Sequence, residues 1–469
     1  MTSGLRAAAP ASAPRTRDAR WPAAAAVVVA VLAGVAAPAT GPLLTAGLAV
    51  VALVAAAAYR PIFATYLYLA TLPLVAGIDR GKFIPLVRPN EALLALLLAG
   101  AGLGGFLRWV QGRPLPLRAR RVDLPLAMFV VLATVWPLAS MMLRGHHPHG
   151  DDLAAVLPVC KLTALYLLVR CTVRTEPQTV RCIRLVVWPA AAIAVLAVLQ
   201  TLHVGPVVSA LATLWPSDSG VLGERGTTTL GSSIATGDYI TISLTMVICC
   251  AGNGLLGRRE RLVLGLTLGA GVLAAGQFST WVAAAVAAVV LLRRFPGLRG
   301  RLVRMLPIAA VAVLVGAPAF LGRLDGFGDG YGVPRSWLGR WDNLSTFYLP
   351  RLGDFGFVTG VSPNSVLPAP ETWRNEIFLE SGYLQFLWVG GIPLLVAFGW
   401  LSFAVLRATG RVRADSGAVG ACAITLQVGW WIVLVLSLID IHLVLRGAGD
   451  LLFTLLAITT GGTNDDRDP

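Results

Sequence analysis

Two glutamates near the end of the chain, Glu376 and Glu380, stand four residues apart just before a long apolar segment. A carboxylate at a membrane boundary can serve as a general base once partial burial raises its affinity for a proton. After Pro370 the sequence predicts a helix over 371–380, which would place Glu376, Glu380 and Tyr383 on one face. Two acids on one face repel each other. We therefore expect a cation from elsewhere to face them, and the arginines of the preceding segment are candidates.

Arginine and aromatic residues mix in that preceding segment, PRSWLGRWDNLSTFYLPRL, residues 334–352. Helical spacing of its large side chains predicts a helix, and these side chains are Trp337, Trp341, Leu344 and Tyr348. Arg340 and Arg351 are eleven residues apart, three helical turns, so both can project from one face. Arginine binds pyrophosphate through paired hydrogen bonds, and flat amphipathic rings suit contact with sugars.

A third arginine, Arg225, lies in GERGTTTLGSS just before another apolar segment. Two interpretations remain open for it. It can extend toward lipid headgroups from an apolar surface, or it can hold a cation over a cavity where a lipid-linked phosphate would lie. Asp238 falls about one turn inside the following apolar segment, where an acid is costly unless it is paired or faces a cavity. Lys161 lies well inside a further segment and is expected to snorkel or to be hydrogen-bonded.

These residue types suit glycosyl transfer from a lipid-pyrophosphate donor. Arginines would hold the pyrophosphate, and Glu380, with Glu376 as second choice, would accept the proton of the acceptor hydroxyl. Trp341 and Tyr383 would contact sugar. Because nucleotides are not present outside the cell, the donor would be lipid-linked. The long segment has no Asp-x-Asp metal motif, so we expect arginine rather than a metal to stabilise the leaving group, and no cofactor.

The elements that must position these residues are membrane-spanning helices. The chain is 56% hydrophobic and 13% charged, with a mean hydropathy of +0.74. Apolar segments of bilayer-spanning length recur along it, and in lipid such segments must be helices. The sequence predicts an all-α, polytopic integral membrane protein of about 12–14 transmembrane helices with one long extracytoplasmic loop. The fullest count comprises 22–39, 43–58, 61–78, 91–107, 124–142, 153–171, 183–202, 231–251, 262–277, 279–292, 304–321, 377–405, 418–438 and 443–459.

The basic residues predict the orientation of these spans. With a cytoplasmic N-terminus and fourteen spans, 26 of the 38 lysines and arginines fall on the cytoplasmic side, which is the bias typical of multi-pass proteins of the cytoplasmic membrane. Both termini are then cytoplasmic. The same placement excludes nucleic acid as the reason for the net charge of +14. The expected divisions are a basic N-terminus (1–21), a transmembrane bundle (22–321), an extracytoplasmic loop (322–376), C-terminal transmembrane helices (377–459) and a cytoplasmic tail (460–469).

Three other features receive plainer interpretations. The basic and then apolar start of the chain predicts a signal anchor, with a cleaved signal peptide as the alternative. The segment Leu143–Asp152 holds three histidines and two aspartates without a fixed ligand spacing, which favours a solvated loop over a metal site. The six cysteines lie in or beside apolar segments, so we expect them to act as small apolar residues.

Three motifs occur together in this chain: Arg225-Gly226 with Gly231, RWDNLSTFYLPRLGDFGFVTGVSP from Arg340, and ESGYLQFLWVGGIP from Glu380. In these motifs, and in layout over roughly residues 60–460, the chain resembles the O-antigen ligase and polymerase superfamily of bacterial envelope glycan assembly. The segment GQFSTWVAAAVAAVV also matches, with Thr280 where the family has an arginine. The ligase branch has a histidine at the position of Glu380, so the glutamate favours the polymerase branch.

The resemblance implies that the chain joins glycan units carried on undecaprenyl pyrophosphate at the outer face of the cytoplasmic membrane. Arg225 and Arg340 would hold the donor pyrophosphate, with Arg351 in support. The implied partners are the lipid-linked glycan, membrane lipid and other envelope-glycan assembly proteins. The alternatives are ligase-type transfer, a transporter or flippase for lipid-linked sugars, and a non-catalytic scaffold. A transporter would place its polar groups near the middle of broken helices, whereas here the unusual residues lie in an outer loop.

Overall fold

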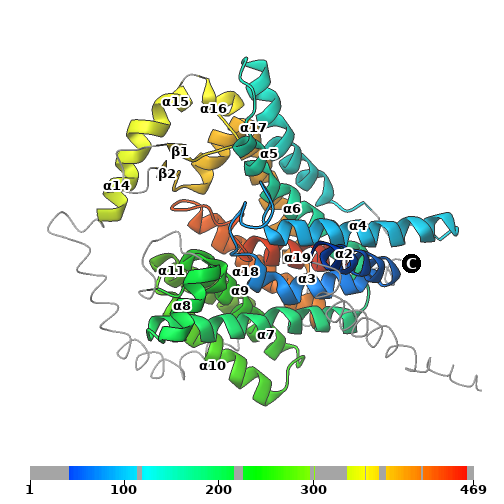
Figure 1. Cartoon of the computed structure of the whole chain (residues 1–469). Helices are drawn as coiled ribbons and strands as arrows, with labels where there is room; N and C mark the ends of the chain where they lie inside the picture. The colour runs from blue at the N-terminus through cyan, green and yellow to red at the C-terminus, as the bar shows by residue number, and fades with distance from the viewer. Residues whose placement is uncertain are drawn as a thin grey trace, which may run out of the picture.

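The computed structural model describes residues 42–113, 119–215, 225–295, 300, 335–353, 355–368, 376–412 and 416–461. These residues are helical almost throughout (Figure 1). Seven of the helices are long and apolar enough to cross a membrane, namely α4 (Pro89–Val110), α5 (Asp123–Leu143), α6 (Gly150–Thr172), α7 (Glu176–Thr201), α9 (Ser233–Gly252), α17 (Gly382–Arg411) and α18 (Gly417–Leu436). The chain is therefore an all-α, multi-pass membrane protein, as predicted.

Further apolar helices complete the bundle. They are α2 (Pro42–Tyr59), α3 (Pro61–Val75), α8 (Gly205–Leu214), α10 (Arg258–Ala275), α11 (Phe278–Arg294) and α19 (Ala448–Gly461). Twelve of the fourteen predicted spans thus have a helix in their place, and α8 was not predicted. The other two predicted spans, 22–39 and 304–321, lie outside the described residues, as does the first part of the predicted 322–376 loop.

Close helix packing depends on small residues, as at the contact between α2 and α4. Gly100 and Gly104 of α4 lie one turn apart and both face α2. A Cβ atom on Gly104 would lie 2.1 Å from the carbonyl oxygen of Ala58. Helices in a membrane gain little from the hydrophobic effect and associate through such close packing. This contact therefore requires glycine at Gly104.

The connections that were predicted to be cytoplasmic lie together at one end of the bundle. Arg170, near the end of α6, forms an ion pair with Asp123 at the start of α5. Arg294, at the end of α11, donates a hydrogen bond of 3.2 Å to the carbonyl oxygen of Thr409 in α17. These contacts agree with the predicted alternation of helix directions. Which end faces the cytoplasm stays a prediction.

The opposite end joins connections that were predicted to be outside. The hydroxyl of Thr229, just before α9, donates a hydrogen bond of 2.6 Å to the carbonyl oxygen of Pro73 in α3. The backbone N–H of Gly382 donates to the carbonyl oxygen of Ser437 at 2.8 Å. Since Gly382 begins α17, the long polar segment before it reaches this same end of the bundle. In Figure 1 that segment, drawn in yellow, stands beside the start of α17.

The polar segment begins with helix, as predicted. Helix α14 (Arg335–Asn343) continues through a π-helical turn, η4 (Leu344–Tyr348), into α15 (Leu349–Gly353), and the short α16 (Gly356–Thr359) follows. A π-helical turn contains more residues than an α-helical turn. The count of three α-helical turns between Arg340 and Arg351 therefore does not hold across it, and the shared face of the two arginines stays a prediction.

The predicted helix over 371–380 is wrong for the residues described there. Strand β2 (Glu376–Ile377) pairs antiparallel with β1 (Leu367–Pro368), and α17 begins only at Gly382. Strand pairing uses the backbone N–H and C=O groups that a helix would have used within itself. No helical face therefore unites the two glutamates with Tyr383.

The side-chain alternation of an extended chain takes the place of that helical face. Ile377 and Leu379 are buried, whereas Glu376 and Phe378 are exposed and Glu380 is half-exposed. The two glutamates therefore lie on the solvent side of one extended segment, and the buried pair anchors its other side. The expectation that both acids face the same way holds, for a different structural reason.

A bend in α17 fixes the polar segment on the bundle. Gly391 has φ 67° and ψ −163°, a conformation that interrupts the helix. The short α16 packs against this bend, and a Cβ atom on Gly391 would lie 2.2 Å from the carbonyl oxygen of Val358. One turn earlier, the indole N–H of Trp388 donates to the carbonyl oxygen of Asn364 at 3.0 Å. The Gly-Gly-Ile-Pro motif therefore serves as the docking point of the polar segment.

Candidate active site

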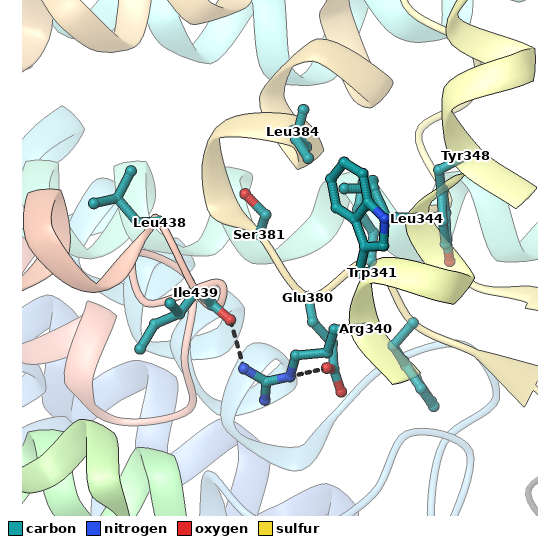
Figure 2. Close-up of a pocket in the computed structure, with 11 residues that line it drawn as sticks. Arg340, Trp341, Leu344, Tyr348, Glu380, Ser381, Leu384, Leu438 and Ile439 are labelled. Carbon is teal, nitrogen blue, oxygen red and sulfur yellow. Dashed lines mark hydrogen bonds and ion pairs between the residues drawn. The ribbon is translucent and has the colours of Figure 1, made fainter. Parts of the chain in front are cut away.

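A pocket of about 420 Å³ opens where the polar segment meets the start of α17. Its walls come from α14 and η4, from the extended residues before α17, and from the connection after α18. Figure 2 shows Arg340, Trp341, Glu380, Ser381 and Ile439 around it. Leucines supply most of the remaining lining, so a few polar groups stand in a mainly apolar pocket. We call it the Arg340 pocket.

Arg340 and Glu380 form an ion pair across this pocket. Their side chains are 31% and 33% exposed, so both can be reached from outside. The Arg340 Nη1 also donates a hydrogen bond of 3.1 Å to the carbonyl oxygen of Ile439 (Figure 2). The prediction that an arginine of the polar segment faces the acids is thus confirmed for Glu380.

An exposed indole borders the ion pair. Trp341 is 64% exposed and lines the pocket next to Arg340. Large exposed aromatic rings beside a charged pair are suited to stacking on a flat ligand face. Its position is consistent with the sugar contact predicted for it, which stays a prediction.

Tyr348 holds the back of the pocket together. Its ring is fully buried and packs edge-on against Trp388, with ring centroids 5.0 Å apart. Its hydroxyl contacts two carbonyl oxygens, those of Ser365 at 2.8 Å and Ile377 at 3.0 Å. Burial raises the pKa of the Tyr348 hydroxyl, which therefore stays protonated and can donate. The π-helical turn is thus tied to β2 and to the residues just before β1, on the way to Glu380.

The other predicted site residues do not line the pocket. Glu376 is exposed in β2, and Arg351 is exposed in α15. The Tyr383 hydroxyl donates to the carbonyl oxygen of Leu434 at 2.7 Å, and its ring packs edge-on against Phe398. Tyr383 therefore packs within the bundle. The catalytic role predicted for Glu376 and the substrate contacts predicted for Arg351 and Tyr383 are not supported by a shared pocket.

Arg225 lies at the same end of the bundle but is not among the residues that line the Arg340 pocket. The next residue, Gly226, donates its N–H to the carbonyl oxygen of Ala274 in α10 at 3.1 Å. A Cβ atom on Gly226 would lie 2.7 Å from the Cβ of Ala197. The glycine is thus explained by close packing. That Arg225 and Arg340 bind the same pyrophosphate stays a prediction.

Asp238 has the partner that its position required. His442, in the connection between α18 and α19, approaches it with 2.6 Å between His442 Nδ1 and Asp238 Oδ2, and both side chains are almost fully buried. Burial alone would lower the pKa of His442, but the Asp238 carboxylate, together with the charge of Asp440, raises it above the ordinary value. His442 was not singled out from the sequence, although an acid inside an apolar segment is a reason to look for such a cation.

Lys161 is hydrogen-bonded within the bundle, one of the two situations expected for it. Its Nζ lies 2.8 Å from Asp450 Oδ2, and Asp450 Oδ1 accepts a hydrogen bond of 2.7 Å from the Tyr68 hydroxyl. The lysine and the aspartate are both buried or nearly so. Pairing of this kind reduces the cost of placing charges inside a membrane protein.

The histidine-rich segment Leu143–Asp152, which runs into the first turn of α6, has a structural role. Asp152 accepts a hydrogen bond of 2.9 Å from the Ser362 hydroxyl of the polar segment, and another of 3.0 Å from the backbone N–H of His149. Among the residues that the structure describes, no group of three or more His, Cys, Asp or Glu side chains could hold a metal ion. The six cysteines are free thiols, and all of them lie within helices of the bundle.

Comparison with known proteins adds no identification to this geometry. No family model and no curated protein matches the chain. The function of the Arg340 pocket therefore has to be argued from its own residues and from the motif resemblance.

Proposed function

We propose that the chain is a membrane glycosyltransferase that joins glycan units carried on undecaprenyl pyrophosphate, in the manner of an O-antigen polymerase. The observation that supports this most is the Arg340–Glu380 ion pair, accessible in a pocket beside the exposed Trp341. One pocket of about 420 Å³ holds three groups that the reaction would use. Arg340 can bind a phosphate, Glu380 can accept a proton, and the ring of Trp341 can contact a sugar. These are the groups that glycosyl transfer requires.

In the proposed reaction the acceptor hydroxyl oxygen attacks the anomeric carbon of the donor. A new carbon–oxygen bond forms as the bond to the pyrophosphate oxygen breaks, and undecaprenyl pyrophosphate leaves with the electron pair. Glu380 accepts the hydroxyl proton, and Arg340 stabilises the charge on the leaving group. No metal or cofactor is needed for this balance.

The ion pair gives this scheme an order of events. A pyrophosphate that accepts hydrogen bonds from Arg340 competes with Glu380 for the same guanidinium. Donor binding would then release the carboxylate, which becomes available to the acceptor. Glu380 would thus act as a base only when the donor is in place. Arg225 and Arg351 remain candidates for further phosphate contacts, and Glu376 for the second carboxylate.

Two alternatives are considered, and one of them has an observation in its favour. Ligase-type transfer would use the same pocket with a different acceptor, and the glutamate at position 380 argues for the polymerase branch by resemblance alone. A transporter for lipid-linked sugars is favoured by the buried pairs Lys161–Asp450 and Asp238–His442, because ionisable groups inside a membrane commonly mark a transport path. The exposed Arg340 pocket favours the enzyme.

Glycan analysis of a deletion strain tests the proposal. Restoring the chain should restore polymerised glycan, restoring Arg340→Gln should not, and a Lys82→Gln control should restore it fully. Lys82 is an exposed cation at the same end of the bundle and does not line the pocket. Normal polymer in the deletion strain, or full activity of Arg340→Gln, would argue against the proposal.

A further inference from the structure

Three arginines gather at the end of the bundle that carries the Arg340 pocket, and none of them lines that pocket. Arg80 and Arg88 come from the connection between α3 and α4, and Arg446 comes from the connection between α18 and α19. The charges of Arg80 and Arg446 both act on the Arg88 guanidinium. We call these three residues the arginine cluster. Like charges at one place repel each other unless anions lie among them.

Two acids stand in the cluster, and each is paired with one arginine. Glu91 Oε1 accepts from the Arg80 guanidinium at 2.9 Å, and Glu91 Oε2 accepts from the backbone N–H of Arg88 at 2.9 Å. Asp79 Oδ1 accepts from the Arg446 guanidinium at 3.1 Å. The chain thus supplies a carboxylate to the guanidinium of Arg80 and another to that of Arg446. Toward Arg88, Glu91 bonds only the backbone N–H and not the guanidinium.

The Arg88 guanidinium has no directly bound carboxylate, although Glu91 and Asp79 lie near enough to act on its charge. Its Nε is buried without a hydrogen-bond partner, and no carboxylate of the described residues forms an ion pair with it. Burial, together with the charges of Arg446 and Arg80, lowers the pKa of Arg88 to about 10, although Glu91 and Asp79 act in the opposite direction. The side chain is therefore still charged at neutral pH. A partly buried, unmatched charge is costly for the folded chain alone. An anion that is not part of the chain would match it.

We propose that the arginine cluster binds the phosphate group of a membrane lipid, with Arg88 as the main contact. Arg88 directly precedes α4, whose apolar span begins at Pro89, so the cluster stands at the depth of lipid phosphates. A guanidinium can bind two phosphate oxygens through parallel hydrogen bonds. The phosphate belongs either to an anionic phospholipid headgroup or to a polyprenyl phosphate. The site is separate from the proposed transfer reaction, since it does not use the Arg340 pocket.

Lipid binding to the full chain in phosphatidylcholine nanodiscs tests this site. Phosphatidylglycerol or undecaprenyl phosphate is titrated in, and bound lipid is counted by native mass spectrometry. The test variant is Arg88→Gln. Lys82→Gln is the matched control, because it removes one charge from an exposed side chain of the same connection. Arg340→Gln shows whether the transfer pocket contributes to the measured binding.

The Arg88→Gln variant should bind one of the two lipids about ten- to a hundredfold more weakly, the factor expected for losing a charged hydrogen-bonded contact. Loss of phosphatidylglycerol identifies a phospholipid site, and loss of undecaprenyl phosphate identifies a carrier site. Lys82→Gln and Arg340→Gln should bind that lipid like the unaltered chain. Equal binding by Arg88→Gln for both lipids, or an equal loss in Lys82→Gln, would overturn the proposal.

Thermal unfolding in phosphatidylcholine alone separates this site from a structural role. Removing an unmatched charge should leave the melting temperature of Arg88→Gln unchanged or raise it. A lower melting temperature, or failure to fold, would make Arg88 a structural residue and contradict the proposal. Arg88→Lys keeps the positive charge but lacks the planar guanidinium that can donate two parallel hydrogen bonds, so it should retain part of the lipid binding.

Discussion

Substitution of Gly391 by alanine probes how the polar segment is held on the bundle. Gly391 has φ 67° and ψ −163°, backbone angles that residues other than glycine rarely adopt. The added Cβ atom would lie 2.2 Å from the carbonyl oxygen of Val358 and 2.9 Å from the backbone nitrogen of Gly360. Both atoms belong to the backbone of the segment docked on α17. They can move away only if α16 leaves its place.

The expected loss follows from these two effects. Backbone strain of this kind costs about 1–3 kcal/mol, and forcing an extra carbon into a packed contact costs about 1–3 kcal/mol. Gly391→Ala should therefore lower the free energy of unfolding by about 2–6 kcal/mol. If the polar segment detaches from α17 while the bundle stays folded, the Arg340 pocket loses one wall. The proposed transfer activity should then fall as well.

Gly399→Ala is the matched control in the same helix. A Cβ atom there meets nothing within 4 Å, and alanine in a helix interior is more favourable than glycine by up to about 1 kcal/mol. The two variants are compared by thermal unfolding in detergent and by limited proteolysis of the polar segment. Gly391→Ala should melt earlier or be cut faster, and Gly399→Ala should do neither. Identical behaviour of the two variants would refute the docking argument.

Three further predictions concern the pocket and its surroundings. Glu380→Gln should reduce transfer about 100- to 10,000-fold while changing stability by less than about 1 kcal/mol, because its ion pair is partly exposed; Glu376→Gln should lose less, and activity assays with unfolding curves check both. Tyr348→Phe should lower the free energy of unfolding by about 1–3 kcal/mol, because it removes a buried hydroxyl within hydrogen-bond distance of two backbone carbonyl oxygens. Thermal melts check this. Asp238 raises the pKa of His442 above its ordinary value of 6.5, so the pair stabilises the fold below pH 6.5 and loses that contribution as the pH rises through the raised pKa. The melting temperature should fall across that range, and His442→Gln should remove this part of the dependence.

Much of the fold could be predicted because segment length and apolar composition leave few choices in a membrane. The twelve helices found at predicted spans follow from that constraint alone. Polar residues inside or beside apolar segments also allowed a prediction, because such residues need partners. Glu380 required a cation and has Arg340, and Asp238 required a partner and has His442.

The errors arose where contacts between distant residues decide the local structure. The residues from Glu376 onward have a helical pattern in isolation, but strand pairing with Leu367–Pro368 makes them extended. The π-helical turn at Leu344–Tyr348 interrupts the regular helix predicted between Arg340 and Arg351, and no local sequence pattern predicts that turn. Tyr383 looked like a site residue by spacing, yet its hydroxyl is used inside the bundle. In each case the outcome depends on packing that spacing alone does not contain.

Product analysis with purified chain tests the central claim most directly. The chain is reconstituted in a bilayer with glycan units on undecaprenyl pyrophosphate, and lipid-linked products are separated by size. The proposed function predicts longer lipid-linked glycans and one undecaprenyl pyrophosphate released for each new bond. Arg340→Gln and Glu380→Gln should form neither product, and Lys82→Gln should form both. Movement of the substrate across the bilayer without any new glycosidic bond, or unchanged extension by Arg340→Gln and Glu380→Gln, would contradict it.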